Sequence, residues 1–183
     1  TYEIGKTAEG RQTIRTELSF PEQPELRAAI EYVVEANGAV TVTMTSDATN
    51  TNLGNYLRLG TNMRLPAGYE NVCWYGNGPV ESMSDRNNFA VVGKYETTVS
   101  KLFYPYLDTQ DTGTLTGTKW FTVTDPERGE ALAVAGREDV ETAALHFTVA
   151  DMTNARHPYQ LTPEEDTILS VNLASQGAGN KSC

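Results

Sequence analysis

The sequence predicts an all-β protein built as an antiparallel β-sandwich. Short runs rich in Thr and Val recur along the 183 residues, and residues typical of turns, such as Gly, Pro, Asn and Asp, separate them. Several runs alternate apolar and polar side chains, which is the pattern of a strand with one buried face. We therefore expect eight to ten strands, little helix, and a single domain over residues 1–183.

The N-terminal part begins with a predicted strand at residues 11–20, which ends at Pro21. Residues 25–48 are compatible with a helix in their first half, but their alternation decides for two strands. Asn37 and Gly38 form a typical hairpin turn between these strands. On the first strand the apolar residues Ala28, Ile30, Tyr32 and Val34 share a face opposite Arg27, Glu31 and Glu35, and on the second Val40, Val42 and Met44 share a face.

The remaining segments continue the β pattern, with one helical candidate at residues 150–157. Residues 91–103 fit either a strand or a mixed segment, and both readings stay open. A hairpin is predicted at residues 117–136, with its turn at 125–129. Further strands are predicted at 56–66, where Leu57 and Leu59 alternate with Arg58, at 69–76, at 142–152, where Leu145, Phe147 and Val149 share one side, and at 166–175.

Composition excludes several classes of function. The formal net charge is −10, from 24 acidic and 14 basic residues, which disfavours binding to nucleic acid and to anionic membranes. No run of about twenty apolar residues is present, so no membrane-spanning helix is expected. The two His and two Cys show no metal-ligand spacing, and we interpret Cys73 as a small buried residue. A soluble protein of the cytoplasm or periplasm is expected, without a choice between these compartments.

One stretch, WYGNGPVESMSDRN at residues 74–87, is unusually dense in functional residue types. It can be interpreted as a catalytic loop in which Glu81 and Asp85 pair for glycoside hydrolysis. The alternative is a structural turn in which hydrogen bonds of acidic and basic side chains hold the loop. We favour the structural interpretation, with the motif residues Trp74, Gly76, Gly78, Pro79, Glu81, Asp85 and Arg86.

Histidines and exposed aromatic residues are the other candidates for chemistry. His146 is compatible with a catalytic base in a sugar cleft, but a hydrogen-bonded surface or groove residue is favoured. His157 is expected to cap the C-terminal end of a helix. Tyr104 and Tyr106 lie in a turn-like segment and are candidates for stacking on sugars. Trp74 and Trp120 are expected in the core.

The segment LPAGYENVCWYGNGPVESMSDR, residues 65–86, resembles a segment of the glycoside hydrolase family 2 β-galactosidases. Later segments follow in the family's order: YPY, GTKWFTVTD, FTVADM, ARHPYQL and QGAGNKSC. The resemblance implies the C-terminal small-chain region, domain 5, whose fold is a supersandwich similar to galactose mutarotase. It also implies that the chain is incomplete at both ends, and Met83 stands where the family has Tyr.

The same resemblance implies no catalytic residue in this chain, because the family's two catalytic glutamates lie in an upstream TIM-barrel domain. That barrel, on the same polypeptide, and the β-galactoside substrate of the parent enzyme are the implied partners, and a homo-oligomeric parent is compatible with it. No cofactor is expected here, and any Mg or Na of the parent is expected in its catalytic domain. The Gly-rich stretch is implied to reach the rim of the substrate cleft through Gly179, Asn180 and Cys183, with Cys183 replacing an aromatic residue.

The expected function is therefore that of a non-catalytic domain. Its parent would hydrolyse terminal β-D-galactosides with retention, and the domain would pack on the barrel and help shape the cleft. The isolated chain is expected to be inactive. Two alternatives are a free-standing carbohydrate-binding module and, by fold analogy alone, an aldose epimerase that would depend on His146 and His157.

Overall fold

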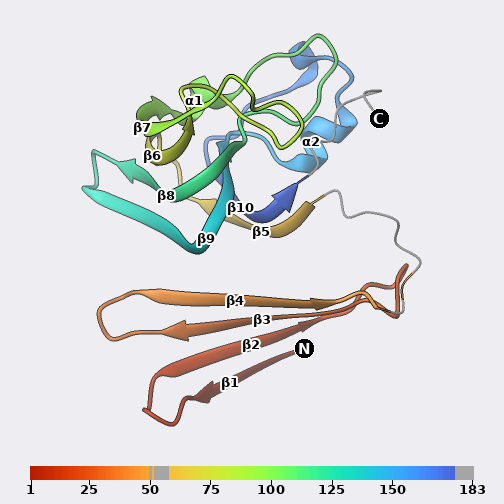
Figure 1. Ribbon diagram of the computed structural model, residues 1–183, viewed down its shortest axis with the longest axis vertical. Helices are drawn as coiled ribbons and strands as arrows, with labels where there is room; N and C mark the ends of the chain where they lie inside the picture. Colours follow the sequence, from red (N-terminus) through yellow and green to blue (C-terminus); the bar gives the residue numbers. More distant parts are fainter. Residues whose placement is uncertain (50, 52–57, 176–183) are drawn as a thin grey trace. The chain divides into compact units, whose positions relative to one another are not determined.

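A computed structural model describes residues 1–49, 51 and 58–175 and is drawn in Figure 1. The chain forms two compact units that divide between residues 55 and 56. Ten strands and three short helices lie in the described part, and the strands form two antiparallel sheets. The predicted all-β antiparallel fold is confirmed, whereas the single domain stays a prediction.

The first unit is a four-stranded meander in which each strand pairs with the next one along the chain. The hairpin predicted around Asn37 and Gly38 is confirmed, since Val34 pairs with Val40 across it. Gly38 has a positive φ of 87°, which a glycine adopts without the steric cost of a side chain. The strands are β1 (Tyr2–Lys6), β2 (Gln12–Leu18), β3 (Arg27–Val34) and β4 (Val40–Asp47).

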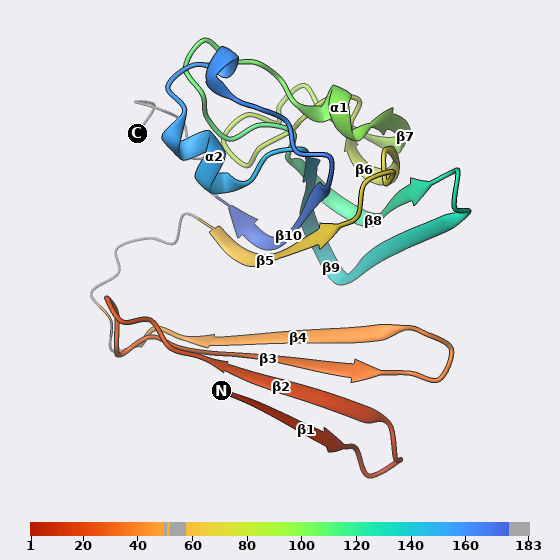
Figure 2. The ribbon, with the colours of Figure 1, turned by 180° about the vertical axis from the view of Figure 1, so that it is seen from behind.

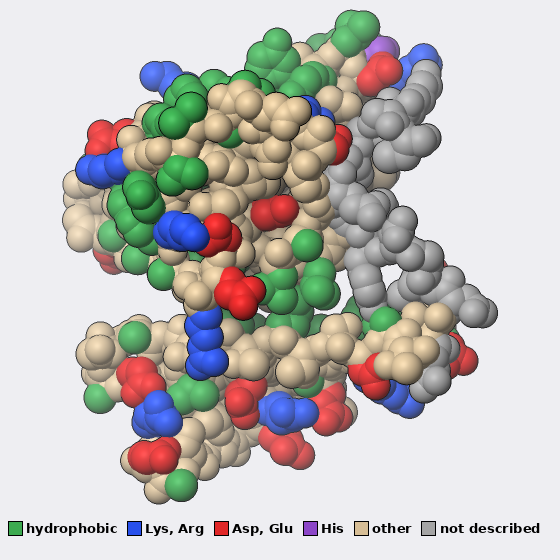
Figure 3. Space-filling view, viewed as in Figure 1, with side chains coloured by type: hydrophobic (Ala, Val, Ile, Leu, Met, Phe, Trp, Pro, Cys, Tyr) green, Lys and Arg blue, Asp and Glu red, His purple; other side chains and the backbone are tan. Residues whose placement is uncertain are grey.

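Register sorts the side chains of this sheet by polarity, because residues paired across antiparallel strands point to the same face. Ile4, Ile14, Tyr32 and Val42 form one such row on one face. The next row, on the opposite face, is Glu3, Arg15, Glu31 and Thr43. Figure 3 shows the first unit from a side on which acidic and basic side chains gather. The sheet is thus apolar on one face and charged on the other.

The second unit is a six-stranded antiparallel sheet with the order β5-β10-β9-β8-β6-β7. In Figures 1 and 2 its short helices and longest loops gather on the same side of the sheet. The strands are β5 (Arg58–Leu65), β6 (Asn71–Gly78), β7 (Val91–Thr98), β8 (Leu115–Asp125), β9 (Glu130–Leu145) and β10 (Thr167–Ser175), and the helices are α1 (Val99–Leu102), α2 (Val149–Asn154) and the 3-10 helix η1 (Pro158–Gln160).

The hydrophobic core described here belongs to the second unit. Alternation along β6 buries Val72 and Trp74, and these pack with Phe121 of β8 and Leu169 of β10. Trp74 is fully buried, and its indole Nε1 donates a hydrogen bond to the carbonyl oxygen of Asn77 at 2.9 Å. Trp120, also expected in the core, is only half-buried.

Two segments differ from the expected strands. Strand β9 ends at Leu145, so the strand expected at residues 142–152 is too long. The reason is a capping box, in which Thr148 Oγ1 accepts from the backbone N–H of Asp151 while the Asp151 carboxylate accepts from that of Thr148. This places Val149 in α2. The open segment at 91–103 divides into β7 and α1, and Leu57 lies outside the described residues.

We predict that Phe121→Ala lowers the free energy of unfolding of the second unit by about 3–5 kcal/mol, because it leaves a cavity at a site with no exposed surface. Urea denaturation followed by tryptophan fluorescence measures the change. Phe89→Ala is the matched control, since 54% of Phe89 is exposed, and a change below about 1 kcal/mol is expected there. Equal losses in the two variants would contradict this account of the core.

Candidate functional site

The WYGNGPVESMSDRN motif leaves β6 through two glycines that other chain segments approach closely. A Cβ on Gly76 would lie 2.8 Å from Cα of Thr118, and one on Gly78 would lie 2.5 Å from the ring of Tyr95. Both distances are shorter than a carbon atom tolerates, so glycine fits these positions for steric reasons. The following residues, 79–90, are called the motif loop below.

Glu81 joins the motif loop to a second loop, residues 103–114, called the facing loop below. Its Oε1 accepts from the hydroxyl of Tyr106 and lies 3.4 Å from Nη2 of Arg86. Its Oε2 accepts from Oγ1 of Thr112 at 3.0 Å and from the backbone N–H of Gly113 at 2.6 Å. Only 11% of the Glu81 side chain is exposed. Both carboxylate oxygens therefore have partners.

The other charged residues of the motif have unequal roles. Arg86 Nη2 lies 3.4 Å from the carbonyl oxygen of Asp111 in the facing loop, and its guanidinium lies 5.3 Å from the ring centroid of Tyr106. Burial works to lower the pKa of Arg86, but Tyr106, Glu81 and Asp85 raise it overall. Asp85 is exposed and acts on Arg86 through its charge. Glu81 and Arg86 thus meet, whereas Asp85 stands at the surface.

The two tyrosines proposed to stack on sugars lie together, with ring centroids 4.7 Å apart. Tyr106 is half-buried, and burial together with the hydrogen bond to Glu81 raises the pKa of Tyr106 to about 12. Tyr104 is 58% exposed, and its backbone N–H donates to Thr112 Oγ1 at 2.8 Å. Tyr104 is therefore the more accessible of the two rings.

Met83 and the buried hydroxyl groups complete the motif loop. Met83 is almost fully buried, at 1% exposure. Ser82 Oγ lies 2.9 Å from Oγ1 of Thr116, and Ser84 Oγ donates to the carbonyl oxygen of Ser175 at 2.7 Å. The motif loop is thereby connected to the last described residue of β10.

An open groove of about 460 Å³ lies beside the facing loop, and mostly apolar side chains line it. The rings of Phe103 and Phe147 are 4.7 Å apart in its wall, and Tyr159 at its rim is 81% exposed. The lining residues are Val99, Ser100, Phe103, Pro105, His146, Phe147, Pro158, Tyr159, Leu161 and Pro163.

His146 supplies a polar wall of this groove, as the favoured sequence interpretation expected. Its Nε2 lies 2.9 Å from Oε2 of Glu70, and its Nδ1 lies 3.0 Å from the carbonyl oxygen of Asp166. The backbone N–H of Ser100 donates to Oε1 of Glu70 at 3.0 Å. Burial works to raise the pKa of Glu70, but the hydrogen bonds from Ser100 and His146 outweigh it and lower that pKa. His146 is thus held between two acceptors.

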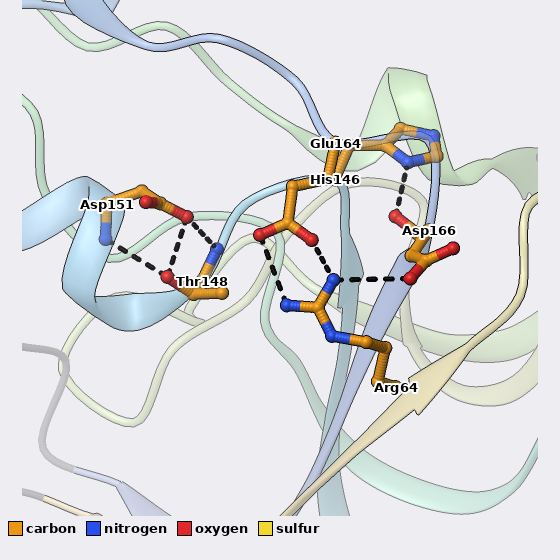
Figure 4. A network of polar contacts seen from close by, with 6 residues as sticks. All are labelled: Arg64, His146, Thr148, Asp151, Glu164 and Asp166. Atoms are coloured by element: carbon orange, nitrogen blue, oxygen red, sulfur yellow. Dashed lines mark hydrogen bonds and ion pairs between the residues drawn. The ribbon is translucent and has the colours of Figure 1, made fainter.

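Figure 4 shows how the neighbourhood of His146 is fixed. Arg64 of β5 reaches both oxygens of Glu164 and lies 3.3 Å from Oδ2 of Asp166. The backbone N–H of Glu164 in turn donates to the carbonyl oxygen of His146 at 2.8 Å. Arg64 therefore anchors the segment that supplies the Asp166 carbonyl group to the imidazole.

The expectation that His157 caps the C-terminal end of a helix is wrong. Helix α2 ends at Asn154, where the N–H of Ala155 donates to the carbonyl oxygen of Asp151. His157 instead precedes η1 with extended φ and ψ angles of −131° and 148°, as a residue before proline favours. Its Nδ1 lies 3.0 Å from the carbonyl oxygen of Leu107, and its ring stacks on Tyr159.

Other expectations from the sequence concern the cleft rim, Cys73, metal ligands and membrane-spanning helices. Gly179, Asn180 and Cys183 lie outside the described residues. Cys73 is half-buried, and burial raises the pKa of its thiol. Within the described ranges, no three His, Cys, Asp or Glu side chains gather as metal ligands, and no helix has the length and hydropathy to cross a membrane.

Sequence reasoning missed the partners of these side chains. Glu70 lies 76 positions before His146, and Thr112 lies 31 positions after Glu81. No local sequence pattern predicts either pair, because both pairs depend on how the strands of the sheet are ordered. The density of the motif indicated that Glu81 has a special role, but not which loop it binds.

The chain is similar to known β-galactosidases over most of its length. The family model described as "Beta galactosidase small chain" matches residues 2–183. The β-galactosidase of Streptococcus thermophilus is 32% identical over 160 residues, which are 87% of this chain and 16% of that protein. That of Lactobacillus delbrueckii subsp. bulgaricus is 28% identical over 166 residues, which are 91% and 16%. The chain thus spans about a sixth of the length of these relatives.

We predict that Glu81→Gln destabilises the second unit by about 1–3 kcal/mol, because the new amide N–H group replaces an acceptor that faces hydrogen-bond donors. Removing the charge of Glu81 also lowers the pKa of Tyr106 from about 12 toward the ordinary tyrosine value. Urea denaturation and a titration of phenolate absorbance measure the two effects. Asp85→Asn, at the exposed acid of the same loop, is the control. A Tyr106 titration unchanged by Glu81→Gln would contradict the contact.

A second prediction concerns pH. The pKa of Glu70 is lower in the folded chain than its ordinary value of 4.5. Its stabilising contribution is therefore present above that value and is lost as the pH falls through the lowered folded pKa. The free energy of unfolding of the wild-type chain is expected to decrease as the pH falls from about 6 to about 3, and this decrease is expected to be smaller in Glu70→Gln. Denaturation midpoints across this range measure it. Glu165→Gln, at an exposed site, should leave the wild-type pH profile unchanged.

Proposed function

Because this chain belongs to the β-galactosidase small-chain family, we propose that it serves as the non-catalytic C-terminal domain of a retaining β-galactosidase. The parent enzyme hydrolyses terminal β-D-galactosides in a separate catalytic domain. In this proposal the domain packs on the catalytic barrel and helps to shape the sugar-binding cleft. In this proposal, any Mg or Na that the parent enzyme uses is bound in that catalytic domain.

The observation that carries the proposal is that both carboxylate oxygens of Glu81 already accept hydrogen bonds. A retaining glycosidase needs two carboxyl groups about 5 Å apart, one free to attack the sugar and the other to exchange a proton with the leaving group. Glu81 accepts hydrogen bonds at both oxygens from Tyr106, Thr112 and Gly113. Attack by this carboxylate would break the bonds that join two loops. Its position favours a structural role, with catalysis elsewhere in the parent.

A role in shaping the cleft is supported by the contact of the motif loop with the end of β10. Ser84 Oγ donates to the Ser175 carbonyl group, and Ser175 Oγ donates to Oε2 of Glu141. Burial raises the pKa of Glu141, which Ser175 and Arg58 partly oppose. The residues proposed to form the rim of the substrate cleft follow Ser175 in the sequence. The motif loop therefore acts, in this proposal, by fixing the base of that rim.

A second candidate, a carbohydrate-binding module, is favoured by the apolar groove and by exposed Tyr104 and Tyr159. Aromatic faces bind the apolar faces of sugar rings, and a few fixed polar groups provide orientation. His146 is a fixed polar group in the wall of the groove, and both of its ring nitrogens already have partners within the protein, at Asp166 and Glu70. This function therefore ranks second.

The proposal is tested with the chain alone and in a chimera. The purified chain is expected to show no hydrolysis of an aryl β-galactoside above a mock purification. Replacing the matching segment of the Streptococcus thermophilus β-galactosidase by this chain should restore activity relative to a variant that lacks the segment. Turnover by the isolated chain that survives stringent purification would refute a non-catalytic role.

Calorimetric titration of the isolated chain with galactosides separates the second candidate from the first. A free-standing binding module gives saturable heat at millimolar sugar or below, and Tyr104→Ala or Tyr159→Ala removes it. The domain role predicts flat titrations for the isolated chain together with an active chimera. Tyr106→Ala is a poor probe of stacking, because its phenol also holds Glu81.

A further inference from the structure

Asn172 of β10 carries a buried amide group that lacks a partner. Only 1% of this residue is exposed. Among the described residues, three buried side-chain oxygen and nitrogen atoms have no hydrogen-bond partner, and two of them are Oδ1 and Nδ2 of Asn172. Nearly all buried polar groups of folded proteins have a partner, which is either a protein group or ordered water. We therefore expect the Asn172 amide to bind something other than the described side chains.

The register of β10 places this amide over a glycine of the neighbouring strand. Asn172 pairs with Gly60 of β5 and with Glu141 of β9. A Cβ on Gly60 would lie 2.2 Å from Oδ1 of Asn172, so the absence of a side chain there makes room for the amide. On β10, Ser170 lies two residues before Asn172 and points to the same face of the sheet. On β5, Arg58 lies two residues before Gly60 and points to that face as well.

Ser170 and Arg58, on either side of the row that contains Asn172, both line a small cavity within the second unit. The volume of this cavity is about 10 Å³, which is about the smallest volume that holds one water molecule. Part of its wall is apolar, and the polar part consists of Arg58, Asp111, Thr112, Thr114 and Ser170. Arg58 Nη2 lies 2.5 Å from Oδ1 of Asp111, and the two side chains are only 21% and 13% exposed. The cavity thus brings a largely buried ion pair and several hydroxyl groups next to the row of the Asn172 amide.

The chemistry of these groups selects water as the ligand. The amide needs an acceptor for its N–H groups and a donor for its oxygen, and a water molecule is both. A cation would bind Oδ1 alone, and the guanidinium group of Arg58 would repel it. An anion would meet the carboxylates of Asp111 in the wall and of Glu141, which pairs with Asn172. A larger neutral molecule does not fit a cavity of about 10 Å³.

We propose that this cavity is a hydration site, in which an ordered water molecule bridges the Asn172 amide to the polar groups of the cavity wall. Asp111, Thr112 and Thr114 belong to the facing loop, so the water joins that loop to β10. Asn172 also stands at the start of an irregularity in the pairing of β10 with β5, between Asn172 and Ala174. The water therefore supports β10 where its pairing with β5 is interrupted. This site belongs to the second unit alone and does not depend on the catalytic role of a parent enzyme.

The test is oxygen-17 magnetic relaxation dispersion of the whole chain in solution, which detects buried water without interference from exchanging protein hydrogens. Because proteins hold on the order of one buried water per 27 residues, the readout is the difference between variants. Asn172→Leu keeps the branching of the side chain without its polar groups, and we expect it to lower the dispersion amplitude by about one water molecule. Asn172→Ser keeps a donor and an acceptor and should retain the amplitude. Asn71→Leu, at an exposed site of β6, is the control and should leave it unchanged.

Circular dichroism checks that each variant is folded. An amplitude that is the same in the wild type and in folded Asn172→Leu overturns the proposal, and so does an equal loss in Asn71→Leu. If Asn172→Leu does not fold, a high-resolution crystal structure of the wild-type chain decides. A water molecule within hydrogen-bond distance of the amide supports the proposal, and a dry cavity overturns it. A wild-type denaturation midpoint that rises with NaCl or KCl but not with choline chloride, and that loses this dependence in Asn172→Ser, would assign the site to a cation and overturn it too.

Discussion

The arrangement of the motif loop and the facing loop depends on the hydrogen bonds of the Glu81 carboxylate. It accepts hydrogen bonds from both a side chain and the backbone of the facing loop, at Thr112 and Gly113, and it also binds Tyr106. A buried carboxylate is stable only when such donors replace its lost hydration. Because these donors come from a loop about thirty residues away, the Glu81 side chain joins the two loops.

Local pattern predicted the parts of the fold that local chemistry determines. The turn at Asn37 and Gly38 needs a residue with positive φ, and alternation on either side of it sets the faces of β3 and β4. The motif also indicated that Glu81 is one of the residues whose hydrogen bonds hold the loop. The end of β9 was misjudged, because the capping box of Thr148 and Asp151 competes with continued alternation. Contacts such as that of His146 with Glu70 depend on strand order, which no local pattern encodes.

The two units illustrate different ways to satisfy the same hydrophobic pattern. In the second unit, the side chains of Trp74, Phe121 and Leu169 pack into a core, with helices and loops on one side of the sheet. In the first unit, register collects apolar side chains such as Ile4 and Val42 on one face of a single layer. Alternation alone predicts both cases equally, because it specifies a buried face without specifying what buries it.

The residues that place this chain in its family differ in kind from those that would perform a reaction. Trp74, Gly76 and Gly78 fit their positions for steric reasons, and Glu81 is held by its partners. Met83 is buried at the position where the family resemblance expects Tyr, and a flexible thioether side chain fits such a site without a partner for a hydroxyl group. A motif of this kind is demanding because close packing tolerates few alternatives. Dense polar sequence can therefore identify a protein by its architecture, and whether its acids are catalytic depends on whether their oxygens remain free.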